Sequence, residues 1–179
     1  MTLRLSLAVL LCVPFASAQE NKTAEKLAPY YPTPETVVER MLKLGGLKAG
    51  EKMFDLGSGD GRIVIMAADK FKADATGVEF DADLYKESSA RIRALGLEKR
   101  ARIIHGDIAK QDFSQAALLT VYLLPTSNDK IRPMLEKQLK KGTRVVAHDF
   151  MFQGWTPVKE EHIEDDGEGR SHTLYLYIR

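Results

Sequence analysis

Residues 55–62 read Asp-Leu-Gly-Ser-Gly-Asp-Gly-Arg, and their types and spacing imply a binding site. Gly57, Gly59 and Gly61 lack a Cβ atom, so the backbone can turn sharply here and approach a ligand closely. A stretch with β character precedes the octet and a helix-like stretch follows it. The helix would point its free N–H groups and the positive end of its dipole at the turn. The octet therefore predicts a site for an anionic or strongly polar ligand.

The glycine spacing narrows the kind of ligand. A dinucleotide-binding turn of the Gly-x-Gly-x-x-Gly type would need glycine at position 62, where the chain has Arg62. A phosphate-binding P-loop would end in Gly-Lys-Ser/Thr, and this octet does not. Instead Asp55 closes the strand ahead of Gly-x-Gly-x-Gly. The turn alone also allows a tight strand–helix connection without a ligand.

The elements that must position this turn alternate along the chain. Strands are expected at residues 52–56, 75–80, 101–105, 118–124, 143–147, 158–163 and 173–178. Helices are expected at about 34–44, 61–71, 83–94 and 129–140, with a short helical or irregular piece near 112–116. The last two strands are joined by a hairpin loop at 165–169. We therefore predict a doubly wound, mostly parallel seven-stranded α/β sheet with a C-terminal antiparallel hairpin and helices on both faces.

In an open α/β sheet, ligands bind beyond the carboxyl ends of the strands, so the residues after each strand are the candidates. Glu79 ends the second strand about 20 residues past the glycine turn, the usual place for an acceptor of ribose hydroxyls. Asp107 and Ile108 follow the third strand. A carboxylate beside an apolar side chain suits the amino group and ring of adenine. Together these residues predict a nucleoside-shaped site.

The octet, then Gly-Val-Glu79, then Gly-Asp107-Ile, in this order and spacing, resemble the successive motifs of class I S-adenosylmethionine (SAM) methyltransferases. The resemblance covers nearly the whole chain after residue 28. It implies that Asp55 faces the methionine amino group and that Glu79 binds the ribose diol, while Asp107 and Ile108 hold the adenine. The cofactor-binding residues that it predicts are Thr33, Asp55, Gly57, Ser58, Gly59, Gly61, Glu79, Phe80, Asp107 and Ile108.

Residues 30–34, Tyr-Tyr-Pro-Thr-Pro, carry a narrower resemblance. With the octet, they are similar to a small group related to the mitochondrial protein-lysine methyltransferases. In that group this segment folds over the cofactor, which would let Thr33 meet the methionine carboxylate. From its position alone, Thr33 is expected to be the N-cap of a helix whose first residue is Pro34. The two roles are compatible.

The methyl acceptor is less well defined by the sequence. After the fourth strand the chain has Tyr122 in Val-Tyr-Leu-Leu-Pro-Thr and lacks the Asn/Asp-Pro-Pro-Tyr motif, which argues against adenine, cytosine or glutamine as acceptor. A protein lysine remains open. Tyr122, His148 and Asp149 are the candidate catalytic residues, because they follow strands four and five and could orient the acceptor or take its proton. The alternative is that Asp149 caps a turn and His148 packs in the core. A SAM- or nucleoside-binding protein without catalysis and a methyltransferase of small molecules also remain open.

Residues 1–18 read as a secretory signal peptide, with Arg4, an apolar run and Ala-Ser-Ala before a cut at Gln19. The apolar run is shorter than the roughly 20 residues of a spanning helix, although an uncleaved anchor is the alternative. We expect a flexible lead-in at 19–28 and a single domain at 29–179. The protein is then exported, periplasmic or secreted, with no stable membrane span. Since SAM is made in the cytoplasm, export would require an outside supply of cofactor.

The remaining composition excludes several classes of function. The only cysteine, Cys12, lies in the expected signal, which excludes disulfides and thiol catalysis after cleavage. Lys+Arg total 26 against 25 for Asp+Glu, so no basic surplus indicates a nucleic-acid partner, and none is expected. The four histidines, at positions 105, 148, 162 and 172, show no ligand spacing along the chain, so no bound metal is expected.

Overall fold

The structure, a computed structural model, describes residue 27 and residues 29–179. The predicted signal peptide at 1–18 lies outside the described residues, and so does the predicted lead-in at 19–28 apart from Leu27. Among the helices that are described, none has the length and apolar character needed to cross a membrane.

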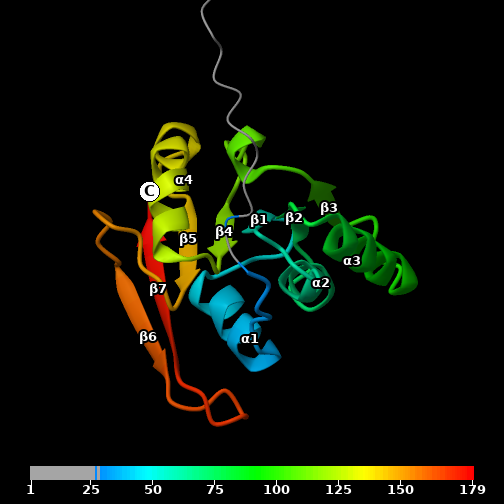
Figure 1. The fold of residues 1–179 in the computed structure, drawn as a ribbon, viewed down its shortest axis with the longest axis horizontal. Helices are drawn as coiled ribbons and strands as arrows, with labels where there is room; N and C mark the ends of the chain where they lie inside the picture. The colour runs from blue at the N-terminus through cyan, green and yellow to red at the C-terminus, as the bar shows by residue number, and fades with distance from the viewer. Residues whose placement is uncertain (1–26, 28) are drawn as a thin grey trace, which may run out of the picture.

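One seven-stranded sheet organises the described chain, with strand order β3-β2-β1-β4-β5-β7-β6 (Figure 1). In chain order the elements are α1 (Glu35–Leu44), β1 (Lys52–Leu56), α2 (Arg62–Asp69), β2 (Asp74–Glu79), α3 (Ala82–Ala94), β3 (Ala101–His105), the 3-10 turn η1 (Ile108–Lys110), β4 (Leu118–Val121), α4 (Pro125–Gln138), β5 (Arg144–His148), β6 (Lys159–Ile163) and β7 (His172–Ile178). Strands β1 to β5 pair in parallel, and β7 runs antiparallel between β5 and β6. The predicted fold class is confirmed.

Apolar cores cover both faces of the sheet, because neighbouring residues of a strand point to opposite faces. Along β1, Met53 belongs to the core that holds α1 and α2, whereas Phe54 and Leu56 belong to the core that holds Ile131 and Leu135 of α4. Figure 1 shows α1 and α2 on one side of the sheet and α4 on the other. With both faces covered, the polar edge at the carboxyl ends of the parallel strands is left for a ligand.

Two element boundaries differ from the sequence prediction around the fourth strand. β4 ends at Val121, and α4 already begins at Pro125. Proline has its φ fixed near the helical value and lacks the N–H that a first helical residue leaves unpaired, so Pro125 starts the helix early. Pro133 consequently lies in the middle of α4 instead of in its first turn. The apolar Leu123 belongs to the connection and is buried in the α4 core.

The short helical piece is also shifted. It was expected near 112–116, but the 3-10 turn η1 lies at Ile108–Lys110, where the carboxylate of Asp107 accepts a hydrogen bond from the N–H of Ala109 at 2.8 Å. A short polar side chain that bonds the backbone two residues on is a common turn former. Asp107 is therefore held at the start of η1, at the ligand edge of the sheet.

Candidate active site

A cavity lies at the point where the strand order reverses, between β1 and β4 and beyond their carboxyl ends. Its volume is about 820 Å³, including the space at its mouth, which suits a ligand the size of a nucleoside derivative. The predicted cofactor residues that line it are Thr33, Asp55, Gly57, Ser58, Gly59, Glu79, Phe80, Asp107 and Ile108. Gly61 does not line the cavity; it precedes the first residue of α2.

The glycine turn adopts a conformation that favours glycine at all three positions. Gly57, Gly59 and Gly61 have φ values of 79°, 52° and 76°. A Cβ atom on Gly59 would also lie 2.8 Å from the ring of Tyr30. The N–H groups of Gly57 and Ser58 both donate to the carbonyl of Val78 at 3.0 Å, which ties the turn to β2. The glycines thus allow the close approach that the octet predicts.

The carboxylate of Glu79 is fixed by two backbone donors. Its Oε2 accepts from the N–H of Gly59 at 2.7 Å, and its Oε1 accepts from the N–H of Asp81 at 2.8 Å. The side chain lines the cavity and is 7% exposed. Each carboxylate oxygen can accept more than one hydrogen bond, so the group can still bind hydroxyl donors in the cavity.

Asp55 is a buried acid at the end of β1. Thr120 of the neighbouring strand donates its hydroxyl to Asp55 Oδ1 at 2.7 Å. Burial raises the pKa of Asp55 to about 7; the hydrogen bond from Thr120 opposes this shift, while the charges of Glu79 and Asp60 add to it. An ammonium group arriving in the cavity would stabilise the ionised carboxylate.

Arg62, the residue that excludes a dinucleotide turn, clamps the segment ahead of α1. It donates to Asp60 Oδ2 at 2.9 Å and, through Nη1, to the carbonyl of Thr33 at 2.9 Å. Tyr30 packs over Gly59, and residues 29–33 line the cavity. Neither Asp60 nor Arg62 was assigned a role from the sequence. Their signal was the non-glycine pair inside the octet.

Only Tyr122 among the three candidate catalytic residues lines the cavity. Its ring packs against the ring of His148 with centroids 3.9 Å apart, and its hydroxyl donates to Asp149 Oδ2 at 3.4 Å. Burial and the charge of Asp149 raise the pKa of Tyr122 to about 12, so the hydroxyl stays protonated at neutral pH. His148 and Asp149 lie behind Tyr122, with the side chain of His148 fully buried.

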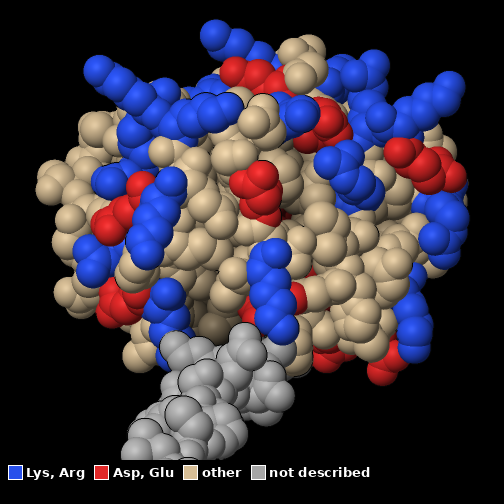
Figure 2. Space-filling model, turned by 90° about the horizontal axis from the view of Figure 1, so that it is seen from above, with Lys and Arg blue, Asp and Glu red and all other residues tan. Residues whose placement is uncertain are grey.

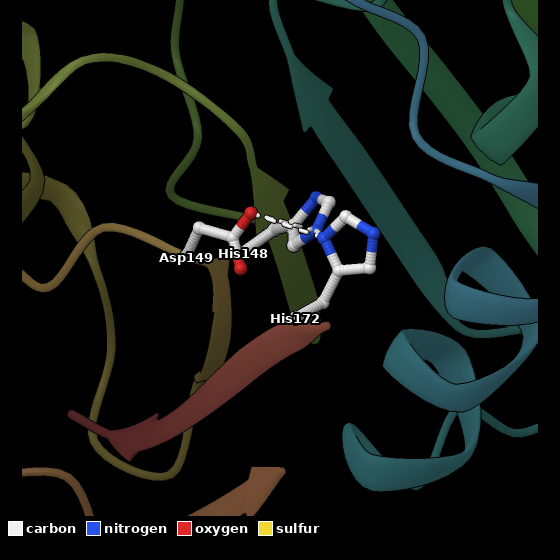
Figure 3. Close-up of side chains that lie close together, drawn as sticks. All are labelled: His148, Asp149 and His172. Carbon is white, nitrogen blue, oxygen red and sulfur yellow. Dashed lines mark hydrogen bonds and ion pairs between the residues drawn. The ribbon is translucent and has the colours of Figure 1, made fainter. Parts of the chain in front are cut away.

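His148 and Asp149 join a cluster that was not predicted from the sequence. It adds His172, the first residue of β7, and Figure 3 shows the three side chains pointing toward one another. His148 Nδ1 also meets the Thr33 hydroxyl at 3.3 Å. Burial lowers the pKa of His148 to about 4, opposed by the charge of Asp149, while His172 lowers it further.

The predicted capping role of Thr33 is therefore wrong. Helix α1 begins at Glu35 with Pro34 as its N-cap and without a side-chain cap. Pro34 keeps an extended ψ of 144°, so the carbonyl of Pro34 accepts the first helical bond and the Thr33 hydroxyl is left for His148.

The donor set fits the chemistry of SAM. The cavity offers a buried acid for an ammonium group, a fixed acid for a ribose diol, and Asp107 beside the buried Ile108 for a base. Ser58 Oγ is buried and has no hydrogen-bond partner within the described part of the chain. A buried polar atom without a partner beside a cavity is suited to a ligand.

Comparison with known proteins agrees with this chemistry. The chain is 43% identical over 151 residues to a protein-lysine N-methyltransferase of Saccharolobus islandicus, covering 84% of this chain and 92% of that protein. It is 32% identical over 139 residues to a human lysine N-methyltransferase named for ATP synthase, covering 78% of this chain but only 58% of that protein. A solved structure from Salinibacter ruber, described as an RNA methyltransferase in complex with S-adenosyl-L-homocysteine, superimposes with a TM-score of 0.76 at 40% identity, covering 83% of this chain and 93% of that chain.

Fold, cavity and relatives together define a class I methyltransferase that uses SAM as its cofactor. The family model for the ANTKMT methyltransferase domain matches residues 55–159, which run from the glycine turn into β6. The chain belongs to this family.

Proposed function

We propose that this methyltransferase transfers the methyl group to the side-chain amino group of a lysine in a protein. The observation that carries the proposal is the 43% identity to a protein-lysine N-methyltransferase, which extends over 92% of that relative. The human relative, a lysine N-methyltransferase named for ATP synthase, supports the same acceptor chemistry.

The cofactor residues are proposed to act as their placement suggests. Asp55 would pair with the methionine ammonium, Glu79 would accept from the ribose hydroxyls, and Asp107 with Ile108 would hold the adenine. Thr33 and the backbone of the glycine turn would lie against the methionine end. SAM supplies an electrophilic methyl group on sulfur, and displacement from it depends mainly on how donor and acceptor are positioned.

The aromatic side chains at the cavity support an amine acceptor. Tyr30, Tyr31 and Tyr122 all line it, and aromatic faces attract alkylammonium groups. The hydroxyl of Tyr31 accepts from Arg170 at 2.9 Å, which fixes that ring at the mouth. A lysine must lose its proton before it can attack, and a partly desolvated aromatic pocket favours the neutral amine. Tyr122 is proposed to orient that amine with its fixed hydroxyl.

RNA is the second candidate acceptor, because the Salinibacter ruber structure at 40% identity is described as an RNA methyltransferase. RNA-binding surfaces usually gather lysine and arginine on one face. On the face shown in Figure 2, acidic side chains are interspersed among the basic ones, and the formal net charge is only +1. These charges favour a protein acceptor.

The acceptor can be tested by incubating the protein and methyl-labelled SAM with three separate pools from the source organism: total protein, total RNA and protein-free small molecules. We expect label in the protein pool, recovered as methyl-lysine after hydrolysis and identified by mass spectrometry. The Gly59→Arg variant, which would fill the cofactor cavity, is the control for enzyme-dependent labelling. Label confined to RNA or to small molecules would refute the lysine proposal and leave the SAM assignment intact.

A further inference from the structure

We propose that His148, Asp149 and His172 form a binding site for a divalent transition-metal ion. The site uses donor atoms of this chain alone and does not depend on the proposed acceptor. The three residues come from the end of β5 and the start of β7, which pair antiparallel (Figure 3). One imidazole nitrogen from each histidine and one carboxylate oxygen meet at a common point.

The donor atoms form a nearly regular triangle. His148 Nε2 lies 2.9 Å from His172 Nδ1, His172 Nδ1 lies 3.1 Å from Asp149 Oδ2, and Asp149 Oδ2 lies 3.3 Å from His148 Nε2. A metal bound to nitrogen and oxygen at about 2.0–2.2 Å holds its ligands roughly 3 Å apart. An ion could therefore sit over this triangle with little movement of the side chains. Two imidazoles and one carboxylate suit zinc and iron in particular.

The outer nitrogens of both histidines have partners of their own. His172 Nε2 lies 3.3 Å from Asp166 Oδ2, and His148 Nδ1 lies 3.3 Å from the Thr33 hydroxyl. Metal-binding histidines usually donate their second N–H to a carboxylate or another oxygen, which fixes the tautomer and the ring. Asp166 is itself held by Arg170 Nε at 2.8 Å. The supporting contacts of a metal site are thus present around the triangle.

These outer contacts fix where the protons are. Ionised Asp166 can only accept, so His172 Nε2 must carry the proton, and Thr33 offers an acceptor for the N–H at His148 Nδ1. In the neutral tautomers, His148 Nε2 and His172 Nδ1 then face each other and Asp149 with lone pairs. Three converging lone pairs repel one another unless a cation lies between them. That cation is either a shared proton or a metal ion.

The backbone of Asp149 holds its carboxylate in this position. Asp149 has φ +58°, a conformation that is strained for a residue with a side chain. Its Oδ1 accepts from the N–H of Thr173 at 2.9 Å, which leaves Oδ2 for the histidines. The side chain is 25% exposed, so an ion can reach the cluster. Since Tyr122 lines the cavity and donates to Oδ2, a bound ion would lie directly behind the cavity wall.

The test is direct binding of metal to the chelator-treated protein. We expect calorimetry with Zn²⁺ to give one site per chain with a micromolar or tighter dissociation constant. We expect Co²⁺ to give the visible absorption bands of a site with nitrogen ligands. Asp149→Asn keeps the shape and the bond to Thr173, and His172→Gln removes an imidazole; each is expected to weaken binding at least 100-fold. Asp166→Asn is expected to weaken it about 10–100-fold.

His162→Ala is the matched control, because His162 lies on β6 with a side chain that is 53% exposed and outside the cluster. It should bind zinc like the unchanged protein. Thermal melts of all variants without metal establish that each is folded. Absence of saturable one-to-one binding by the unchanged protein would overturn the proposal and indicate a shared proton instead. Equal binding by folded Asp149→Asn and by the unchanged protein would overturn it as well.

Discussion

The carboxylate of Glu79 accepts a hydrogen bond from the backbone N–H of Gly59 at 2.7 Å. This bond joins the end of β2 to the glycine turn that follows β1. The second carboxylate oxygen holds the N–H of Asp81 ahead of α3. The acid proposed to bind the ribose is therefore also the group that holds two turns of the cofactor site in place.

Glu79→Ala is expected to weaken SAM binding and to loosen the site at once. The change leaves the N–H groups of Gly59 and Asp81 without their acceptor, which costs about 1–3 kcal/mol of stability. It also removes the proposed ribose acceptor, so calorimetry should show SAM affinity lower by at least about 10–100-fold. Glu98→Ala, at an exposed position, is the control. SAM binding by Glu79→Ala equal to that of the control would contradict the assignment.

Gly77→Ala is expected to disturb the turn from the opposite side. A Cβ atom on Gly77 would lie 2.5 Å from Ser58 Cβ and 2.7 Å from Ile103 Cδ1. Because both neighbours are buried, the turn must shift, and we expect a loss of about 1–3 kcal/mol in the free energy of unfolding. SAM affinity should fall as well. Urea unfolding and calorimetry measure the two effects.

Gly106→Ala is the matched control for that change, because its new Cβ atom would meet only the flexible end of Gln111, at 3.2 Å. We expect it to lose less than about 1 kcal/mol. Equal losses for the two variants would mean that the close approach of Gly77 to Ser58 is not what the site requires.

The sequence was sufficient to predict the sheet and the cofactor edge, because parallel strands place the residues after them at one edge. Asp55, Glu79 and Asp107 could be chosen by position alone, and all three line one cavity. The contact of Arg62 with the carbonyl of Thr33 could not be predicted. It depends on how the segment before α1 folds back, for which local patterns carry no signal.

The histidine cluster was missed for a related reason. His148 and His172 are neither close in sequence nor at the ends of parallel neighbours; they meet because β7 inserts antiparallel beside β5. A search for ligand spacing along the chain cannot detect donors brought together across antiparallel strands. The early end of β4 was missed because Leu123 continues the apolar run without continuing the strand.

SAM binding is expected to weaken below about pH 7. The pKa of Asp55 is raised to about 7 by burial, with Glu79 and Asp60 as the charged groups that raise it further and Thr120 as the donor that opposes the shift. Below this pH the acid is protonated and cannot pair with the methionine ammonium, so affinity should fall by up to about tenfold per pH unit. Calorimetry across this range measures the slope. Asp55→Asn should bind more weakly at neutral pH and show a flat profile.

The stability of the SAM-free protein should change with pH in the matching direction. Between the ordinary pKa of 3.8 and the folded value of about 7, the folded state binds the Asp55 proton that the unfolded state releases. The contribution of Asp55 to stability is therefore present below about pH 4 and is lost as the pH rises through about 7. Urea unfolding at several pH values should show this decline in the unchanged protein and a smaller one in Asp55→Asn. An identical decline in both proteins would assign the titration to another group.

Tyr122→Phe is expected to lower turnover without changing SAM binding. Phenylalanine keeps the ring that packs on His148 but loses the hydroxyl that lies 3.4 Å from Asp149 Oδ2. If that hydroxyl orients the acceptor amine, kcat should fall by about 10–100-fold, the worth of a hydrogen bond to a charged or developing charge. The dissociation constant of SAM should stay within about twofold, because the ring still closes the cavity. Tyr85→Phe is the control, since Tyr85 also stacks on a histidine, His105, but does not line the cavity. An unchanged kcat, or a loss confined to SAM affinity, would remove Tyr122 from the acceptor site and leave its ring with a packing role only.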